Sequence, residues 1–154
     1  MESSIAAPSE STGSTTIADM AALAAERFGD RAAVRYKHDG EWRDVSFAEL
    51  GEIVSEIARG LIDLGLQPGD RVALLCTTRP EWTYADFAIT SAGGVVVPIY
   101  PTNSPSECAW VAGNSESRFI VCENAEQVDK IDEVRGELPK LEVVIAIEPV
   151  DGTL

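Results

Sequence analysis

Short apolar runs that recur between helical patterns constrain the fold of this chain more than any other feature. Four runs are almost wholly apolar at successive positions: Arg71 to Cys76, Val95 to Val97, Arg118 to Cys122 and Leu141 to Ile147. Such runs suit strands that are buried on both faces, as in a parallel sheet covered by helices. We therefore expect an α/β fold, with a doubly wound, mostly parallel sheet that carries helices on both faces.

The stretch from Ala92 to Glu116 indicates how one unit of this sheet is built. Gly93 and Gly94 are expected to end a helix, because glycine accepts the left-handed conformation that a helix end requires. Val95 to Val97 is then predicted to be a central strand. Val96 is expected to be fully buried in it.

Helical patterns fill the segments between the runs. Ser46 with Glu49 and Ser104 with Glu107 fit the capping box, in which a serine and a glutamate bond to each other's backbone amides. The expected helices run from Ile17 to Phe28 with Thr16 as cap, from Phe47 to Leu64, from Pro80 to Ala92, onward from Ser104, and from Asn124 to Leu138.

A small antiparallel ribbon is predicted ahead of the sheet. Ala32 to Tyr36 and Glu41 to Val45 are short strand-like segments, and Asp39-Gly40 between them favours a tight hairpin turn. His38, the only histidine, lies in this turn. A solvated turn residue is favoured there over a catalytic base.

Length and charge limit the classes of function. A chain of 154 residues with 45% hydrophobic content is about one domain long. Its net charge of −14 argues against nucleic-acid binding, which needs clustered Lys and Arg. The first residues lack the basic and apolar regions of a signal peptide. We expect a flexible leader over residues 1–15, a domain over 16–154, and a location in the cytoplasm or peripheral to a membrane.

The cysteines indicate a reducing compartment. Cys76, Cys108 and Cys122 are odd in number and form no CxxC pair. Buried free thiols are favoured over a disulfide framework or a metal site.

The sequence carries no catalytic motif. No GxGxxG follows a strand, and Gly60 with Gly65 has P-loop spacing but lacks the lysine and ends a helix. The carboxylates are spread along helix surfaces, which suits a solvated face. No catalytic, cofactor-binding or metal-ligating residue is therefore assigned.

A resemblance to a known family adds to this interpretation. The order of its motifs is similar to the N-terminal part of AMP-forming acyl-CoA synthetases, most of all to long-chain fatty acid CoA ligases. The resemblance runs from about Ile17 to Pro149. It is carried by Ser46-Phe47-Ala48-Glu49-Leu50, by Pro68 to Leu74, by Glu81-Trp82, by Ala92 to Ser104 and by Cys108-Ala109-Trp110.

The resemblance implies an activity and also a limit to it. Members of the family use ATP and Mg to convert a fatty acid to an acyl-adenylate, then transfer the acyl group to CoA. The family's phosphate loop, acidic ribose ligand and C-terminal lysine have no counterpart before Leu154. The resemblance thus implies an N-terminal fragment that binds none of these cofactors alone and is completed by the missing C-terminal portion of the enzyme. The resemblance also implies that most of the acyl pocket lies outside this segment, so these residues do not predict the length of the acyl chain.

Two alternatives stay open. The chain could instead be a non-catalytic α/β interaction module, or a fragment of another adenylate-forming enzyme, such as a carboxylic acid reductase or an amino-acid-activating domain. Tyr100, Thr102 and Asn103 follow a strand, where α/β sheets build their sites. A role in packing the loop is favoured for them over contact with a ligand.

Overall fold

The structure, a computed structural model, describes residues 11–151 and residue 153. A four-stranded parallel sheet in the order β4-β3-β5-β6 forms its centre. The strands are β3 (Arg71–Leu75), β4 (Val95–Ile99), β5 (Phe119–Cys122) and β6 (Val143–Ala146). A separate antiparallel ribbon pairs β1 (Ala32–His38) with β2 (Glu41–Ser46). The predicted α/β class is confirmed, including the ribbon.

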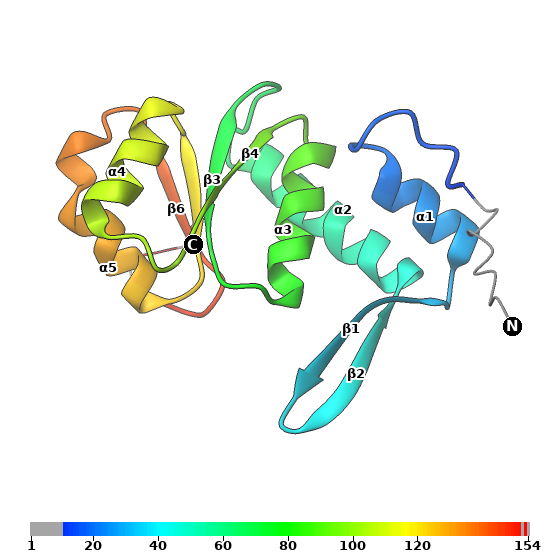
Figure 1. Cartoon of the computed structure of the whole chain (residues 1–154). Helices are drawn as coiled ribbons and strands as arrows, with labels where there is room; N and C mark the ends of the chain where they lie inside the picture. The colour runs from blue at the N-terminus through cyan, green and yellow to red at the C-terminus, as the bar shows by residue number, and fades with distance from the viewer. Residues whose placement is uncertain (1–10, 152, 154) are drawn as a thin grey trace, which may run out of the picture.

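Helices cover both faces of the sheet (Figure 1). On one face lie α1 (Met20–Phe28), α2 (Phe47–Asp63) and α3 (Pro80–Ser91). On the other lie α4 (Pro105–Asn114) and α5 (Ala125–Glu133), followed by a single 3-10 turn, η1 (Arg135–Glu137). Successive side chains of a strand point to opposite faces. In β3, Val72 and Leu74 accordingly pack on the first layer, and Ala73 and Leu75 on the second.

Local signals in the sequence explain where helices begin and end. Both predicted capping boxes are present, at Ser46 with Glu49 and at Ser104 with Glu107. After α2, Gly65 has a φ of 95° and the Leu66 amide donates to the Leu61 carbonyl. This is the hydrogen bond of a glycine C-cap.

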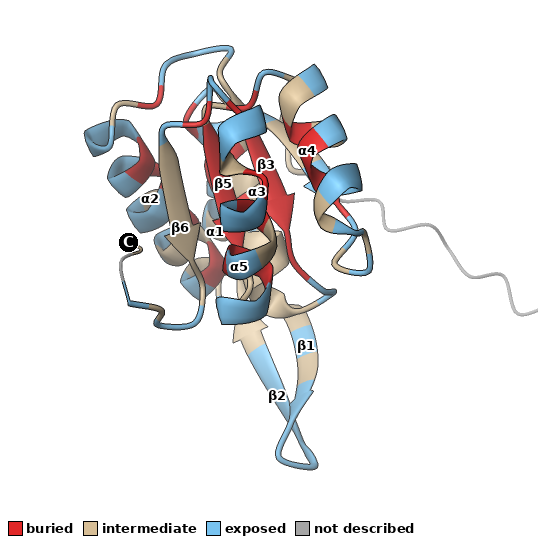
Figure 2. Cartoon of the chain, turned by 90° about the vertical axis from the view of Figure 1, so that its left-hand side faces the viewer, coloured by how far each residue is buried: buried red, intermediate tan, exposed pale blue. Residues whose placement is uncertain are grey.

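The ribbon projects from the helices and is mostly exposed (Figures 1 and 2). Asp39 and Gly40 both have positive φ, 51° and 82°, which is the geometry of a tight two-residue hairpin turn. His38 ends β1, and its Nε2 lies 3.2 Å from the exposed Asp39 carboxylate.

The position predicted for the strand at Val95 to Val97 was wrong. In the described part of the chain β4 pairs only with β3, so it is an edge strand, whereas β3 and β5 are central. Val95 is 48% exposed and Val96 is half-buried, not fully buried. An apolar run indicates what covers a strand's faces, but it carries no information about how many neighbours the strand has.

Two helix boundaries also differ from the prediction. α1 begins at Met20, because Thr16 and Asp19 bond to each other's amides in a turn ahead of it, leaving Asp19 as the cap. The predicted helix from Asn124 to Leu138 is interrupted at Val134, where α5 has ended and η1 begins.

Residues 1–10 of the predicted leader lie outside the described residues. Among the described helices, none combines the length and the apolar character that a membrane crossing requires.

Candidate functional site

The parallel strands end at one edge of the sheet, here called the carboxyl edge, where α/β proteins usually bind ligands. A groove of about 710 Å³ opens there between the ends of β3 and β4. One wall is formed by Cys76, Thr77 and Thr78, with Trp82 from α3 beside them, and the other by the loop after β4. The lining residues of that second wall are Pro98, Ile99, Tyr100, Pro101 and Thr102.

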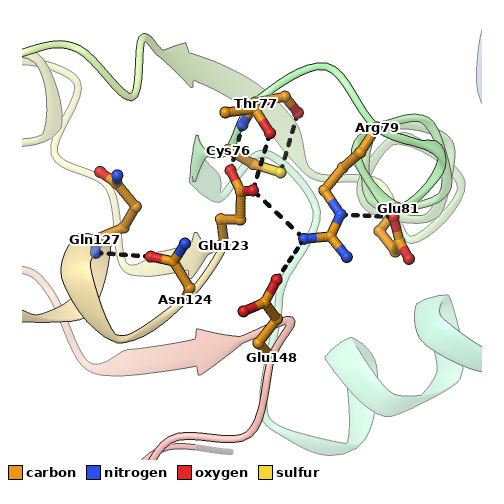
Figure 3. Close-up of polar contacts among 8 residues, drawn as sticks. All are labelled: Cys76, Thr77, Arg79, Glu81, Glu123, Asn124, Gln127 and Glu148. Carbon is orange, nitrogen blue, oxygen red and sulfur yellow. Dashed lines mark hydrogen bonds and ion pairs between the residues drawn. The ribbon is translucent and has the colours of Figure 1, made fainter. Parts of the chain in front are cut away.

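Glu123 fastens the first wall. It directly follows β5, the neighbour of β3, and its carboxylate accepts hydrogen bonds from the Thr77 amide at 2.7 Å and the Thr77 hydroxyl at 2.9 Å (Figure 3). Its side chain is only 13% exposed. Burial alone would raise the pKa of Glu123, but the hydrogen bonds from Thr77 and the charge of Arg79 hold that pKa below its ordinary value. Glu123 is therefore ionised at neutral pH.

Arg79 joins the carboxyl ends of three strands. It caps α3, and its guanidinium donates to Glu81 at 2.8 Å, to Glu148 at 2.8 Å and to Glu123 at 3.4 Å (Figure 3). The hydrogen bonds with Glu81 and Glu148 raise the pKa of Arg79, which stays charged. This network connects the segments that follow β3, β5 and β6.

Lys130 supports the second wall. From α5 its ammonium group donates to the Pro101 carbonyl at 2.7 Å, and its side chain is 19% exposed. Within the same loop the Asn103 amide donates to the Tyr100 carbonyl at 3.0 Å. Tyr100 itself is 78% exposed beside the groove.

The groove holds no activated nucleophile. Burial, followed by the negative charge of Glu123, raises the pKa of the Cys76 thiol to about 12. Burial likewise raises the pKa of Cys122 to about 12. A protonated thiol is a poor nucleophile and a poor metal ligand. All three cysteines are buried and free, as the sequence predicted.

The residues at this edge do not fit a nucleoside triphosphate or its magnesium ion. One first-turn amide of α4 and one of α5 are already bound, because Ser104 accepts from Glu107 and Asn124 accepts from Gln127. The first turn of α3 contains Pro80, which has no amide, and Glu81, which would repel phosphate. Across residues 11–151 and 153, no three His, Cys, Asp or Glu side chains are placed to hold a metal ion.

The sequence led to some of these residues and missed others. Of the three loop residues considered, Tyr100 and Thr102 line the groove, whereas Asn103 closes the same turn but is not among the lining residues. His38 is not among the lining residues. Glu123 and Lys130 were missed. The one usable signal was the position of Glu123, a charged residue immediately after a buried strand.

Comparison with known proteins identifies the family. The sequence profile of the family described as AMP-binding enzyme matches residues 22–153. The long-chain-fatty-acid–CoA ligase FadD15 of Mycobacterium bovis is 41% identical over 109 residues, which are 71% of this chain and 18% of the relative. The long-chain-fatty-acid–CoA ligase ACSBG2 of Xenopus laevis is 38% identical over 119 residues, 77% of this chain and 16% of the relative.

A solved structure gives the same picture of the fold. The long-chain-fatty-acid–CoA ligase FadD1 from Archaeoglobus fulgidus superposes with a TM-score of 0.77 at 21% identity, over 89% of this chain and 28% of that one. The present chain thus spans less than a third of each of these proteins. Since the family profile extends over almost the whole sequence, the chain belongs to the AMP-binding enzyme family.

Proposed function

We propose that this chain is the N-terminal part of a long-chain fatty acid CoA ligase. Such an enzyme activates a fatty acid with ATP to an acyl-adenylate and transfers the acyl group to CoA. The observation that carries the proposal is the 41% identity over 109 residues to the long-chain-fatty-acid–CoA ligase of Mycobacterium bovis. The order of motifs from Ser46 to Trp110 supports the same assignment.

In this proposal the described residues shape the enzyme without performing its chemistry. Adenylyl transfer depends on positioned cations and amides around the phosphates. The carboxyl edge instead presents Glu81, Glu123 and Glu148, each paired with Arg79. ATP, Mg and CoA would therefore be bound by parts of the ligase outside this chain.

A chimera tests the proposal. The segment of the Mycobacterium bovis ligase that aligns with this chain is replaced by the residues of this chain. We expect the chimera to form AMP in a reaction that requires palmitate and CoA. A matched chimera with Leu74→Asp should be inactive, because Leu74 is wholly buried at the centre of the sheet.

A chimera that folds like its parent but forms no AMP would contradict the ligase assignment and favour an interaction module. Circular dichroism and the unfolding midpoint of the two proteins establish whether the chimera is folded.

We also propose that the protein resides in the cytoplasm. Three cysteines remain free and buried in the structure, which suits a reducing compartment. Fractionation of cells that express the full chain, followed by immunodetection, checks this location.

A further inference from the structure

The two walls of the groove come from adjacent strands, yet each is fastened to the same third element. The segment after β3, Thr77 and Thr78, forms one wall, and the loop after β4 forms the other. The contacts that hold them both come from the β5–α5 unit, defined here as Phe119–Glu133. Within the described residues β5 pairs with β3 and β6, and not with β4.

On the β3 side, Glu123 binds both polar groups of Thr77. The amide and the hydroxyl donate to different oxygens of the carboxylate, at 2.7 and 2.9 Å. Figure 3 shows Glu123 pointing toward Thr77 from the segment that directly follows β5. The Glu123 side chain is mostly buried, although Thr77 is exposed, and a bidentate contact of this kind restrains the orientation of the residue that it holds.

On the β4 side, Lys130 reaches the loop from the middle of α5. Its ammonium group donates to the Pro101 carbonyl at 2.7 Å, and Glu126, one turn earlier, lies 3.5 Å from it. Within the described residues β4 pairs only with β3, and this contact adds a restraint from α5 to the loop that follows β4. Lys130 lies in α5, and Glu123 directly precedes Asn124, the cap of that helix, so a short continuous segment carries both contacts.

We infer that Glu123 and Lys130 are positioning residues that together set the width of the groove. Neither side chain lines the groove. Each acts through the wall segment that it holds, Glu123 through Thr77 and Lys130 through Pro101. This inference stands whether or not the chain is part of a ligase.

Amide hydrogen exchange on the full chain tests the Glu123 contact. In Glu123→Gln the Thr77 amide should exchange about tenfold faster. The substitution replaces the charged acceptor of its hydrogen bond by a neutral amide oxygen, which binds the Thr77 amide less strongly. Glu148→Gln is the matched control, because Glu148 also pairs with Arg79 but has no contact with Thr77. Unchanged exchange at Thr77 in Glu123→Gln would overturn the inference.

Lys130→Met tests the other wall. The Asn103 amide closes the turn that contains Pro101, through its hydrogen bond to the Tyr100 carbonyl. We expect this amide to exchange several times faster, while Leu74 in the sheet stays protected. Lys140→Met, at an exposed lysine, should change neither amide. If Leu74 and Asn103 accelerate equally, Lys130 stabilises the whole fold and not the wall, and the inference fails.

The kinetics of the palmitate-dependent chimera give a second test, which rests on the proposed function. Glu123→Gln and Lys130→Met should alter KM severalfold more than kcat, because a displaced wall changes the fit of neighbouring segments without removing a reacting group. Equal loss of kcat in both variants, with KM unchanged, would contradict the positioning role. An inactive parent chimera would instead refute the ligase proposal and leave the exchange results standing.

Discussion

Gly51 of α2 and Ala25 of α1 meet where the two helices cross, so closely that a Cβ added to Gly51 would lie 2.6 Å from the Ala25 Cβ. No real pair of side chains tolerates that separation, so the glycine is what allows α1 to rest on α2. This contact holds the N-terminal helix against the rest of the first helical layer.

Gly51→Ala should therefore destabilise the chain by about 1 to 3 kcal/mol, the usual cost of overpacking a contact. Gly60→Ala in the same helix is the control, because a Cβ there meets nothing within 4 Å. It should stabilise by up to about 1 kcal/mol, since alanine favours a helix. Urea unfolding of both variants measures the difference. Equal effects of the two substitutions would contradict the close packing of α1 on α2.

Val72 and Val96 are register partners in neighbouring strands, but they differ in burial. Val72 is wholly buried in β3, whereas Val96 is half-buried in the edge strand β4. Val72→Asp should cost about 3 to 5 kcal/mol and unfold the chain, because it buries an unpaired carboxylate. Val96→Asp should cost clearly less. If thermal melts show that Val96→Asp lowers the unfolding midpoint more than Val72→Asp does, the unpaired edge of β4 is covered in solution.

Gln127 is 5% exposed, and its Oε1 accepts no hydrogen bond from the described residues. A buried polar atom without a partner costs free energy that an apolar side chain of similar shape does not. Gln127→Leu should therefore raise the free energy of unfolding by about 1 kcal/mol. Urea denaturation measures it. A destabilised variant would show that Oε1 accepts a hydrogen bond in solution from a group outside the described residues.

The pH dependence of stability should report the ion pairs at the carboxyl edge. The pKa of Glu123 is lowered in the folded state, so its contribution is present above about pH 4.3, the ordinary value for Glu, and is lost as the pH falls further. Thermal melts from pH 7 to pH 3 should show a smaller acid-induced loss for Glu123→Gln than for the parent chain. Parallel curves would contradict the lowered pKa.

Asp86 serves as the control, because its pKa is shifted in the opposite direction from that of Glu123. Burial raises the pKa of Asp86, so its ionised form opposes folding at neutral pH. Asp86→Asn should stabilise the chain at pH 7, and this gain should shrink as the pH falls and Asp86 becomes protonated.

Features set by neighbouring residues were predictable from the sequence, and features set by distant residues were not. Ser46 and Glu49 lie three positions apart, so their capping box is visible in the chain itself. Gly65 and the Asp39-Gly40 turn are equally local. By contrast, Glu123 and Thr77 are separated by 46 positions, and only the pairing of β3 with β5 brings them together.

The neighbours of each strand in the sheet could not be predicted from the sequence for a related reason. The run Val95 to Val97 predicted a strand covered on both faces, but the edge position of β4 follows from the whole strand order and leaves Val95 48% exposed. The end of α5 at Glu133 was also missed, because Val134 continues the apolar stripe even though the backbone there leaves the helical conformation.

In the proposed ligase, these residues shape the enzyme and do not carry out its chemistry. The most direct test is fatty-acid-dependent exchange of pyrophosphate into ATP by the purified 154-residue chain, with palmitate and Mg supplied. The described residues offer no phosphate-binding loop, and their thiols stay protonated. We therefore expect no exchange above that of a boiled sample. Palmitate-dependent exchange above the boiled control would contradict it, and would place the reacting groups within this chain.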